Sequence, residues 1–525
     1  MDLTGLSLKK KPAKSSLLDT IARVGDRLPD PVLIFGFLII VLMILSAWAD
    51  AAGWSAVNPL SGAKVQAESL LSLENIRRLL VEMPTTMTAF PPLGLVLVVM
   101  LGAAVAERSG LFAALLGGAV KRVPRAALTP CIFVLGVLSH HASDAAYVVM
   151  IPLTALVYAQ AGRHPLLGIA VAYAGISGAF AGNYIPGQFD VLMLGITEAA
   201  AKIIDPNFVM NPLGNWWFTL SIGIVFTPIA WWVADKVVEP RLGKWTGSSS
   251  PLGEEEASLG QITPDQKRGL RHAGVAFLAV VGLFAGLTLW PGFAPLIDTE
   301  AVGPAQMTPF YKALIAGFFL LFLATGWTFG RATGTIKTHH DAISMMGNGM
   351  RDMAPYLVLI FAAAHFIAMF SWSGLGPVLA IKGAELLQGL NLPKPAMLTG
   401  LLVMSSGLDI VIGSASAKWS ALAPIVVPML MLLGISPEMT TAAYRMGDSI
   451  FNIVTPLASN FPLVLIMCRR WVPDFGIGSL IAMMIPFSIA FMVAGLSLVM
   501  IWVGFDLPVG PHAPASYAIP LGSVR

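Results

Sequence analysis

Apolar segments long enough to cross a lipid bilayer recur along most of this chain, and they constrain its fold more than any other feature. Hydrophobic residues make up 56% of the 525 residues, and charged residues only 12%. A transmembrane helix needs about 20 predominantly apolar residues. Within lipid, only helices and closed barrels satisfy their own backbone hydrogen bonds. The sequence therefore predicts an all-α polytopic membrane protein.

The apolar segments fall into three kinds. Unbroken spans are expected near 31–50, 88–106, 215–235, 272–290, 310–330, 353–372 and 475–503. Two further spans, 166–195 and 440–467, are interrupted by Gly, Pro and polar residues. Segments 127–162 and 395–434 each hold two short apolar runs joined by a polar tip, which is typical of a re-entrant hairpin. The total is nine spans and two hairpins.

Two stretches are expected to lie at the membrane surfaces. Residues 51–85 are mixed in character and predict an outer loop with a short surface helix. Residues 110–126 are moderately apolar and end in basic residues, which predicts an amphipathic helix on the inner surface.

Basic residues set the expected orientation. They are concentrated in segment 1–30 and in the predicted inner loops, of which 240–270 is the longest. Lys and Arg favour the cytoplasmic side, so the N-terminus is expected inside and the C-terminus outside. The net charge of +3 is small and dispersed, which argues against nucleic-acid binding.

The two hairpin units resemble each other in sequence. The run 147–153 is similar to 424–429, and 183–186 is similar to 452–456, while the charge pattern gives the two hairpins opposite topology. This pattern is typical of the inverted repeats of secondary transporters, whose substrate site lies near the bilayer midplane. The expected division is 1–30 (cytoplasmic segment), 31–126 and 196–394 (scaffold, with loop 240–270), 127–195 and 395–467 (transport domain), and 468–525 (last helix and tail).

The most unusual stretch, 413–462, places ionisable side chains in sequence that is otherwise apolar. Such groups are costly at membrane depth and mark substrate or ion pathways by default. Trp419 can stack on an aromatic ring, and Arg445 can hold a carboxylate in a bidentate manner. The alternative is a packed tryptophan and a structural pair between Arg445 and Asp448, which lie three residues apart on a helix.

A cation site is also expected in the broken segments. Oxygen ligands for Na⁺ are available from Asn183, Asp409, Asp448 and Asn452. Protonation of a buried carboxylate would instead couple H⁺. The sequence leaves both ions open, and no cofactor other than a coupling Na⁺ is expected.

Other polar residues have competing interpretations. Lys418 either extends toward the membrane surface or neutralises a carboxylate at the hairpin tip, and the alternative is that it binds substrate. Asp190 either belongs to the site or caps an outer helix. His140 and His141 are expected to pack at the tip of the first hairpin, with proton transfer as the alternative. His365 is expected to form an interhelical hydrogen bond.

The segment from Ser414 to Trp419, which reads Ser-Ala-Ser-Ala-Lys-Trp, closely resembles the AbgT family of p-aminobenzoyl-glutamate transporters, as does 444–448. The resemblance covers nearly the whole chain. It implies a homodimeric elevator-type transporter in the bacterial inner membrane. The implied substrates are p-aminobenzoyl-glutamate and, by efflux, sulfonamide antimetabolites. Residues matching the family's functional positions are Asp190, Ser416, Trp419, Pro437, Arg445, Asp448 and Pro456.

One position departs from the family pattern. The place before the second hairpin tip usually holds Asn, and here it holds Asp409. A carboxylate at this place would strengthen a cation site or add a proton carrier, so the coupling ion does not carry over simply from the family.

Two other functions remain open from the sequence. Paired re-entrant hairpins also build channels, although a set of Trp, Arg and Asp suits a site that closes around an organic ligand. A membrane hydrolase would need a metal or a nucleophile, and the chain contains neither an H-E-x-x-H nor a G-x-S-x-G motif. The expectation is therefore a transporter and not an enzyme.

Overall fold

The computed structural model describes residues 31–57, 62–121, 123–124, 127–142, 144–245, 262–290, 292–301, 306–409, 412–456, 458 and 460–518. The predicted cytoplasmic segment 1–30, most of the inner loop 240–270 and the tip residue Ser143 lie outside this part of the chain.

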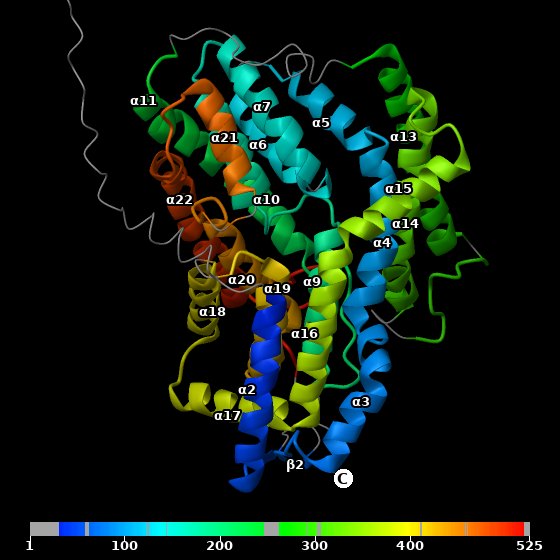
Figure 1. Cartoon of the computed structure of the whole chain (residues 1–525), viewed down its shortest axis with the longest axis vertical. Helices are drawn as coiled ribbons and strands as arrows, with labels where there is room; N and C mark the ends of the chain where they lie inside the picture. The colour runs from blue at the N-terminus through cyan, green and yellow to red at the C-terminus, as the bar shows by residue number, and fades with distance from the viewer. Residues whose placement is uncertain are drawn as a thin grey trace, which may run out of the picture.

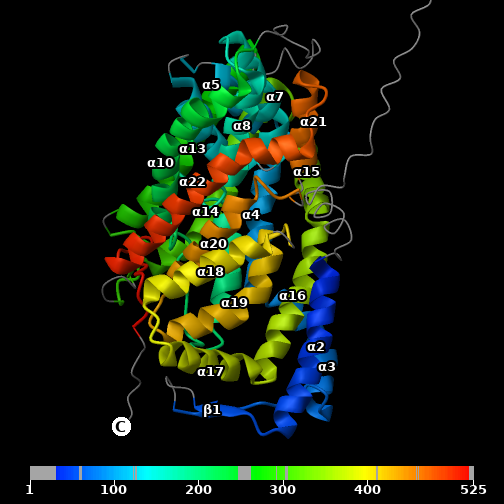
Figure 2. The same cartoon turned by 90° about the vertical axis from the view of Figure 1, so that its left-hand side faces the viewer.

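The described chain is mostly helical (Figures 1 and 2). Eight helical segments are long and apolar enough to cross a membrane: Val32–Ala51, Leu73–Arg108, Trp216–Leu242, Pro264–Leu289, Thr308–Thr333, Ala354–Trp372, Ala415–Leu432 and Ile477–Gly504. Seven of them coincide with the seven unbroken spans expected from the sequence. The eighth is the second arm of the second hairpin.

The first hairpin unit has the expected form. Its arms are α6 (Leu128–Leu138) and α7 (Asp144–Gln160), joined by a 3-10 turn at Ser139–Ala142. The broken span follows as α8 (Pro165–Tyr173), a π-helical turn (Ala174–Gly178), a non-helical stretch and α9 (Gln188–Ala201).

The second hairpin unit repeats this order. Its arms are α18 (Lys394–Leu408) and α19 (Ala415–Leu432), followed by α20 (Pro437–Phe451) and α21 (Phe461–Trp471). In each unit the helix after the hairpin packs against both arms: α8 against α6 and α7, and α20 against α18 and α19.

The bases of the two hairpins lie at opposite ends of α10 (Trp216–Val233), which continues through a π-helical turn into α11 (Glu239–Leu242). At one end, the Asn215 amide donates to the Glu438 carbonyl, 2.7 Å away, at the base of the second hairpin. At the other end, Arg163 at the base of the first hairpin pairs with Asp235 and Glu239. The two hairpins therefore enter the molecule from opposite ends of α10, which is the arrangement that an inverted repeat requires (Figure 1).

The remaining helices surround these units. One group comprises α4 (Pro91–Arg108), α13 (Pro264–Leu289), α14 (Thr308–Thr333) and α15 (His339–Asp352). Another comprises α2 (Pro31–Ala51), α3 (Leu73–Thr88) and α16 (Ala354–Trp372), and α17 (Leu375–Gly389) packs on α19. The last helix, α22 (Ile477–Gly504), packs against α10, α18 and α20.

Three details correct the sequence interpretation. The expected inner-surface helix, α5 (Leu111–Lys121), is mostly buried and packs on α7, because it is apolar on nearly all sides. The outer segment contains a small antiparallel sheet, β1 (Ser55–Val57) and β2 (Lys64–Gln66), which the prediction of an all-α fold did not include. His365 bonds through Nδ1 to the Phe361 carbonyl of its own helix, 2.6 Å away, rather than to another helix.

A glycine sets the closeness of α18 and α20. A Cβ on Gly447 would overlap the backbone carbonyl of Leu402, so only glycine allows this approach. We expect Gly447→Ala to separate the helices, lowering the apparent free energy of unfolding by about 1–3 kcal/mol, the usual cost of overpacking. Denaturation in detergent measures the loss. Gly400→Ala is the matched control, because a Cβ there meets nothing within 4 Å and should cost little.

Candidate functional site

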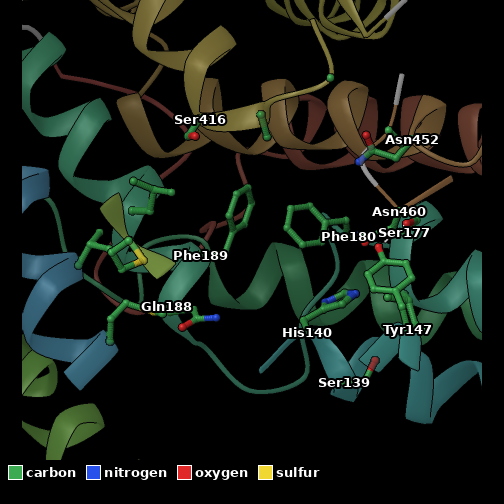
Figure 3. Close-up of a pocket in the computed structure, with 18 residues that line it drawn as sticks. Ser139, His140, Tyr147, Ser177, Phe180, Gln188, Phe189, Ser416, Asn452 and Asn460 are labelled. Atoms are coloured by element: carbon green, nitrogen blue, oxygen red, sulfur yellow. Dashed lines mark hydrogen bonds between the residues drawn. The ribbon is translucent and has the colours of Figure 1, made fainter. Parts of the chain in front are cut away.

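A cavity of about 430 Å³ lies where the two hairpin tips meet α9 and α4 (Figure 3). Its described lining comes from both hairpin units and from the surrounding helices. The lining residues are Val96, Met100, Ser139, His140, Tyr147, Ile176, Ser177, Phe180, Gln188, Phe189, Leu192, Met353, Gly413, Ala415, Ser416, Asn452, Ala458 and Asn460.

The cavity combines aromatic walls with uncharged hydrogen-bonding groups. The rings of Phe180 and Phe189 lie 4.4 Å apart between centroids, and the His140 ring lies edge-on to Phe180. The Tyr147 and Ser177 hydroxyls are hydrogen-bonded at 2.6 Å. None of the described lining residues carries a fixed charge. Such a site suits an aromatic ligand with polar substituents.

The tip of the second hairpin presents a helix N-terminus to the cavity. Gly413, Ala415 and Ser416 line it, and α19 begins at Ala415. Ser414 caps this helix by accepting from the Ala417 amide at 3.3 Å. Because the N-terminal end of a helix carries partial positive charge, this wall favours an anionic group. Of the predicted substrate residues, Ser416 is the one that lines the cavity.

Behind this tip lies a buried ionic cluster. The Lys418 ammonium contacts Asp409 Oδ1 and lies 2.7 Å from Asp448 Oδ1. The single proton of the Tyr444 hydroxyl has two acceptors within reach, the Ala415 carbonyl at 2.6 Å and Asp448 Oδ1 at 3.2 Å. All three ionic side chains are almost completely buried. Lys418 thus neutralises a tip carboxylate, as one of its interpretations expected, and its ammonium does not extend toward the membrane surface.

A second ion pair joins the two broken spans. Arg445 Nη1 lies 2.7 Å from Asp190 Oδ1, and the guanidinium sits over the Phe189 ring. Asp190 Oδ2 also accepts from the Asn183 amide and from the Gly187 backbone N–H, both at 2.7 Å. Asp190 thus caps α9 and pairs with Arg445 as well. The alternative pair between Arg445 and Asp448 is not formed in this structure, because each has another partner.

Trp419 lies behind the cavity wall. Its side chain is fully buried, stacks on Tyr444 with centroids 4.3 Å apart, and donates from Nε1 to Thr197 Oγ1 at 2.9 Å. A substrate ring would reach the indole only after a rearrangement of the tip. In this conformation Trp419 packs in the interior of the protein, as the alternative interpretation expected.

The other predicted residues are spread over the domain. Pro437 is the first residue of α20, beside the Ser436 cap, and Pro456 lies in the non-helical stretch after that helix. Asn452 lines the cavity, whereas Asn183 bonds to Asp190. The four candidate Na⁺ ligands therefore do not form one cluster, although Asp409 and Asp448 do share Lys418.

Several lining residues were not foreseen from the sequence. Phe180 and the adjacent pair Gln188 and Phe189 flank the break between α8 and α9, and Asn460 flanks the break between α20 and α21. Helix interruptions in membrane spans border cavities. Their position next to the predicted breaks was the available signal, but Phe and Gln are too common to single out.

The profile of the AbgT putative transporter family matches residues 16–517. The p-aminobenzoyl-glutamate transport protein of Escherichia coli (strain K12) is 35% identical over 511 residues, covering 96% of this chain and 99% of that protein.

Two solved structures share the whole fold. The YdaH transporter of Alcanivorax borkumensis, described as having an unusual topology, superposes with a TM-score of 0.86 at 39% identity, covering 92% of this chain and all of that one. MtrF of Neisseria gonorrhoeae, described as illuminating a class of antimetabolite efflux pumps, gives 0.87 at 37% identity, covering 95% and 100%. By sequence and by fold, the chain belongs to the AbgT family of membrane transporters.

Proposed function

We propose that this protein is a secondary active transporter that moves p-aminobenzoyl-glutamate, exports sulfonamide antimetabolites, or does both, using an ion gradient. The observation that carries the proposal is the cavity enclosed by two oppositely entering hairpin tips. The names of its relatives support the substrate class: one is a p-aminobenzoyl-glutamate transport protein, and another represents antimetabolite efflux pumps.

The cavity chemistry agrees with these substrates. Both contain an aminobenzene ring, which the Phe180 and Phe189 walls accommodate. The amide and anionic groups would meet Gln188, Asn452 and the N-terminus of α19 at Ser416. Because none of the described lining residues is a carboxylate, this part of the wall does not repel an anionic substrate.

The architecture supports an elevator movement. The two hairpin units would travel together as a transport domain past the scaffold, of which α4 supplies the facing wall through Val96 and Met100. The family resemblance adds a homodimer in the bacterial inner membrane, and the distribution of basic residues adds a cytoplasmic N-terminus. The coupling ion is Na⁺ or H⁺, and the Asp409–Lys418–Asp448 cluster is the place where a cation would act.

The test is flux of labelled p-aminobenzoyl-glutamate and of a sulfonamide in proteoliposomes. Na⁺ and H⁺ gradients are imposed separately, each with and without a membrane potential. We expect saturable flux driven by one of the gradients, which identifies the ion. Non-saturable flux that is indifferent to both gradients would indicate a channel instead, and release of free glutamate would indicate a hydrolase.

The aromatic wall gives a prediction of its own. We expect Phe180→Ala to raise the KM for p-aminobenzoyl-glutamate about 2- to 12-fold, because an aromatic contact with the substrate ring worth about 0.5–1.5 kcal/mol is lost. Phe361→Ala is the matched control, because Phe361 is 41% exposed on α16, away from the lining. Equal KM values in both variants would place the substrate elsewhere.

A further inference from the structure

The buried cluster behind the second hairpin tip is not balanced in charge. With its three groups ionised, one ammonium, Lys418, faces two carboxylates, Asp409 and Asp448. The Lys418 and Asp409 side chains are 0% exposed, and that of Asp448 is 2% exposed. Burial of an uncompensated charge is expensive. The cluster therefore attracts one further monovalent cation or gives up one negative charge.

An unpartnered atom marks where the imbalance lies. Asp409 Oδ2 is buried and accepts no hydrogen bond from the described residues, while Asp409 Oδ1 contacts Lys418. The facing Asp448 Oδ1 already receives both Lys418 and the Tyr444 hydroxyl. Buried carboxylate oxygens are nearly always paired in native structures. Asp409 Oδ2 is thus the open ligand of this cluster.

The cluster also joins the two arms of the second hairpin, α18 and α19, to the following helix, α20. Asp409 follows the last residue of α18, Lys418 lies in the first turn of α19, and Asp448 lies on α20. The Lys418 ammonium is the common partner of the two carboxylates. Ser416, two residues from Lys418, lines the cavity. A movement of the first turn of α19, to which both residues belong, therefore changes the cavity wall.

We propose that Lys418 is a tethered cation that competes with Na⁺ for the Asp409–Asp448 pair. The ammonium occupies the space between the carboxylates that a bare cation would need. Na⁺ that binds at Asp409 Oδ2 supplies the positive charge that the cluster lacks and weakens the attraction between Lys418 and the two carboxylates, which loosens the link of α19 to α18 and α20 and opens the tip. This inference rests on the proposed transport function only in its last step, because competition for the carboxylates is a property of the folded protein alone.

The test measures Na⁺ binding without substrate. Thermal unfolding of purified protein in detergent is followed across a NaCl series, with choline chloride replacing NaCl to hold ionic strength constant. We expect Lys418→Gln to bind Na⁺ at least about tenfold more tightly than the wild type, because a competing unit charge at contact distance is removed. Lys418→Arg, which keeps the charge, should not show the gain.

A second variant covers the case in which Lys418→Gln fails to fold. Asp409→Asn/Lys418→Gln keeps the net charge of the wild-type cluster and leaves the Asp448 carboxylate open to solution cations, so it should also show Na⁺-specific stabilisation. Folded variants whose Na⁺ response equals that of the wild type would overturn the proposal and leave Lys418 a purely structural link. Flux is measured separately from Na⁺ binding. A variant that binds Na⁺ more tightly but does not transport would contradict the opening of the tip by Na⁺, and not the competition between Lys418 and Na⁺ for the carboxylates.

Discussion

Asp448→Ala should abolish gradient-driven transport while leaving a folded protein. The substitution takes from Lys418 the carboxylate 2.7 Å away, while the Tyr444 hydroxyl keeps the Ala415 carbonyl as an acceptor at 2.6 Å. Breaking a buried ion pair costs about 3–5 kcal/mol, and each 1.4 kcal/mol is a factor of ten. If the pair acts in the transport cycle, coupled flux should fall at least about 100-fold. Labelled uptake into proteoliposomes under the driving gradient measures it.

The structure explains why folding should survive this change. Lys418 keeps its contact with Asp409, so the remaining pair is electrically neutral. Glu385→Ala is the control, because it also removes a paired carboxylate, but one that is 58% exposed and bonded to Lys382 on α17. Surface pairs contribute about 0–1 kcal/mol, so flux should be unchanged. Coupled flux that persists in a folded Asp448→Ala protein would remove this carboxylate from the mechanism.

Asp409→Asn tests whether the Asp409 carboxylate takes part in ion coupling. The change leaves one ammonium and one carboxylate, so the cluster becomes neutral without an added cation. We expect transport to continue, with an ion dependence different from that of the wild type. The measurement is the same flux assay over a series of Na⁺ concentrations and pH values. Identical ion dependence in both proteins would give Asp409 no part in coupling.

Hydropathy was sufficient to predict most of the helices. Seven long spans and both hairpins follow from uninterrupted or interrupted apolar runs, because the bilayer fixes helix length and forbids unpaired backbone. The helices α15 and α17 were not predicted. His339–Asp352 is amphipathic and polar, and Leu375–Gly389 is shorter than a span, so neither gives a transmembrane signal.

The partners of the charged residues were beyond the reach of the sequence. Asp448 lies three residues from Arg445 and was the natural local partner, but Arg445 pairs with Asp190, 255 positions earlier. Which carboxylate meets which cation depends on how two distant breaks face each other, and no local periodicity records that. The composition of 413–462 predicted that a site lies there. It did not predict that Trp419 would be packed behind the wall rather than on it.

Substitution of either partner in the Arg445–Asp190 ion pair should strongly lower the stability of the protein. Arg445→Met leaves the Asp190 carboxylate with the Asn183 amide and the Gly187 N–H, and Asp190→Asn leaves a guanidinium that is only 2% exposed. Two guanidinium nitrogens, Nε and Nη2, already lack hydrogen-bond partners, so the loss of Asp190 should be the more severe change. Each substitution should lower the apparent free energy of unfolding by about 3–5 kcal/mol.

A double-mutant cycle distinguishes a structural pair from a binding residue. In Arg445→Met/Asp190→Asn, neither charge remains buried. The loss of stability should therefore be smaller than the sum of the losses in the two single variants. Denaturation in detergent measures the cycle, and flux is measured on the same preparations. Stability that returns without transport would mean that Arg445 also acts on the substrate or the transport movement. Additive stability losses would contradict the pairing, and recovery of both stability and transport would show that Arg445 holds α20 against α9 and does nothing more.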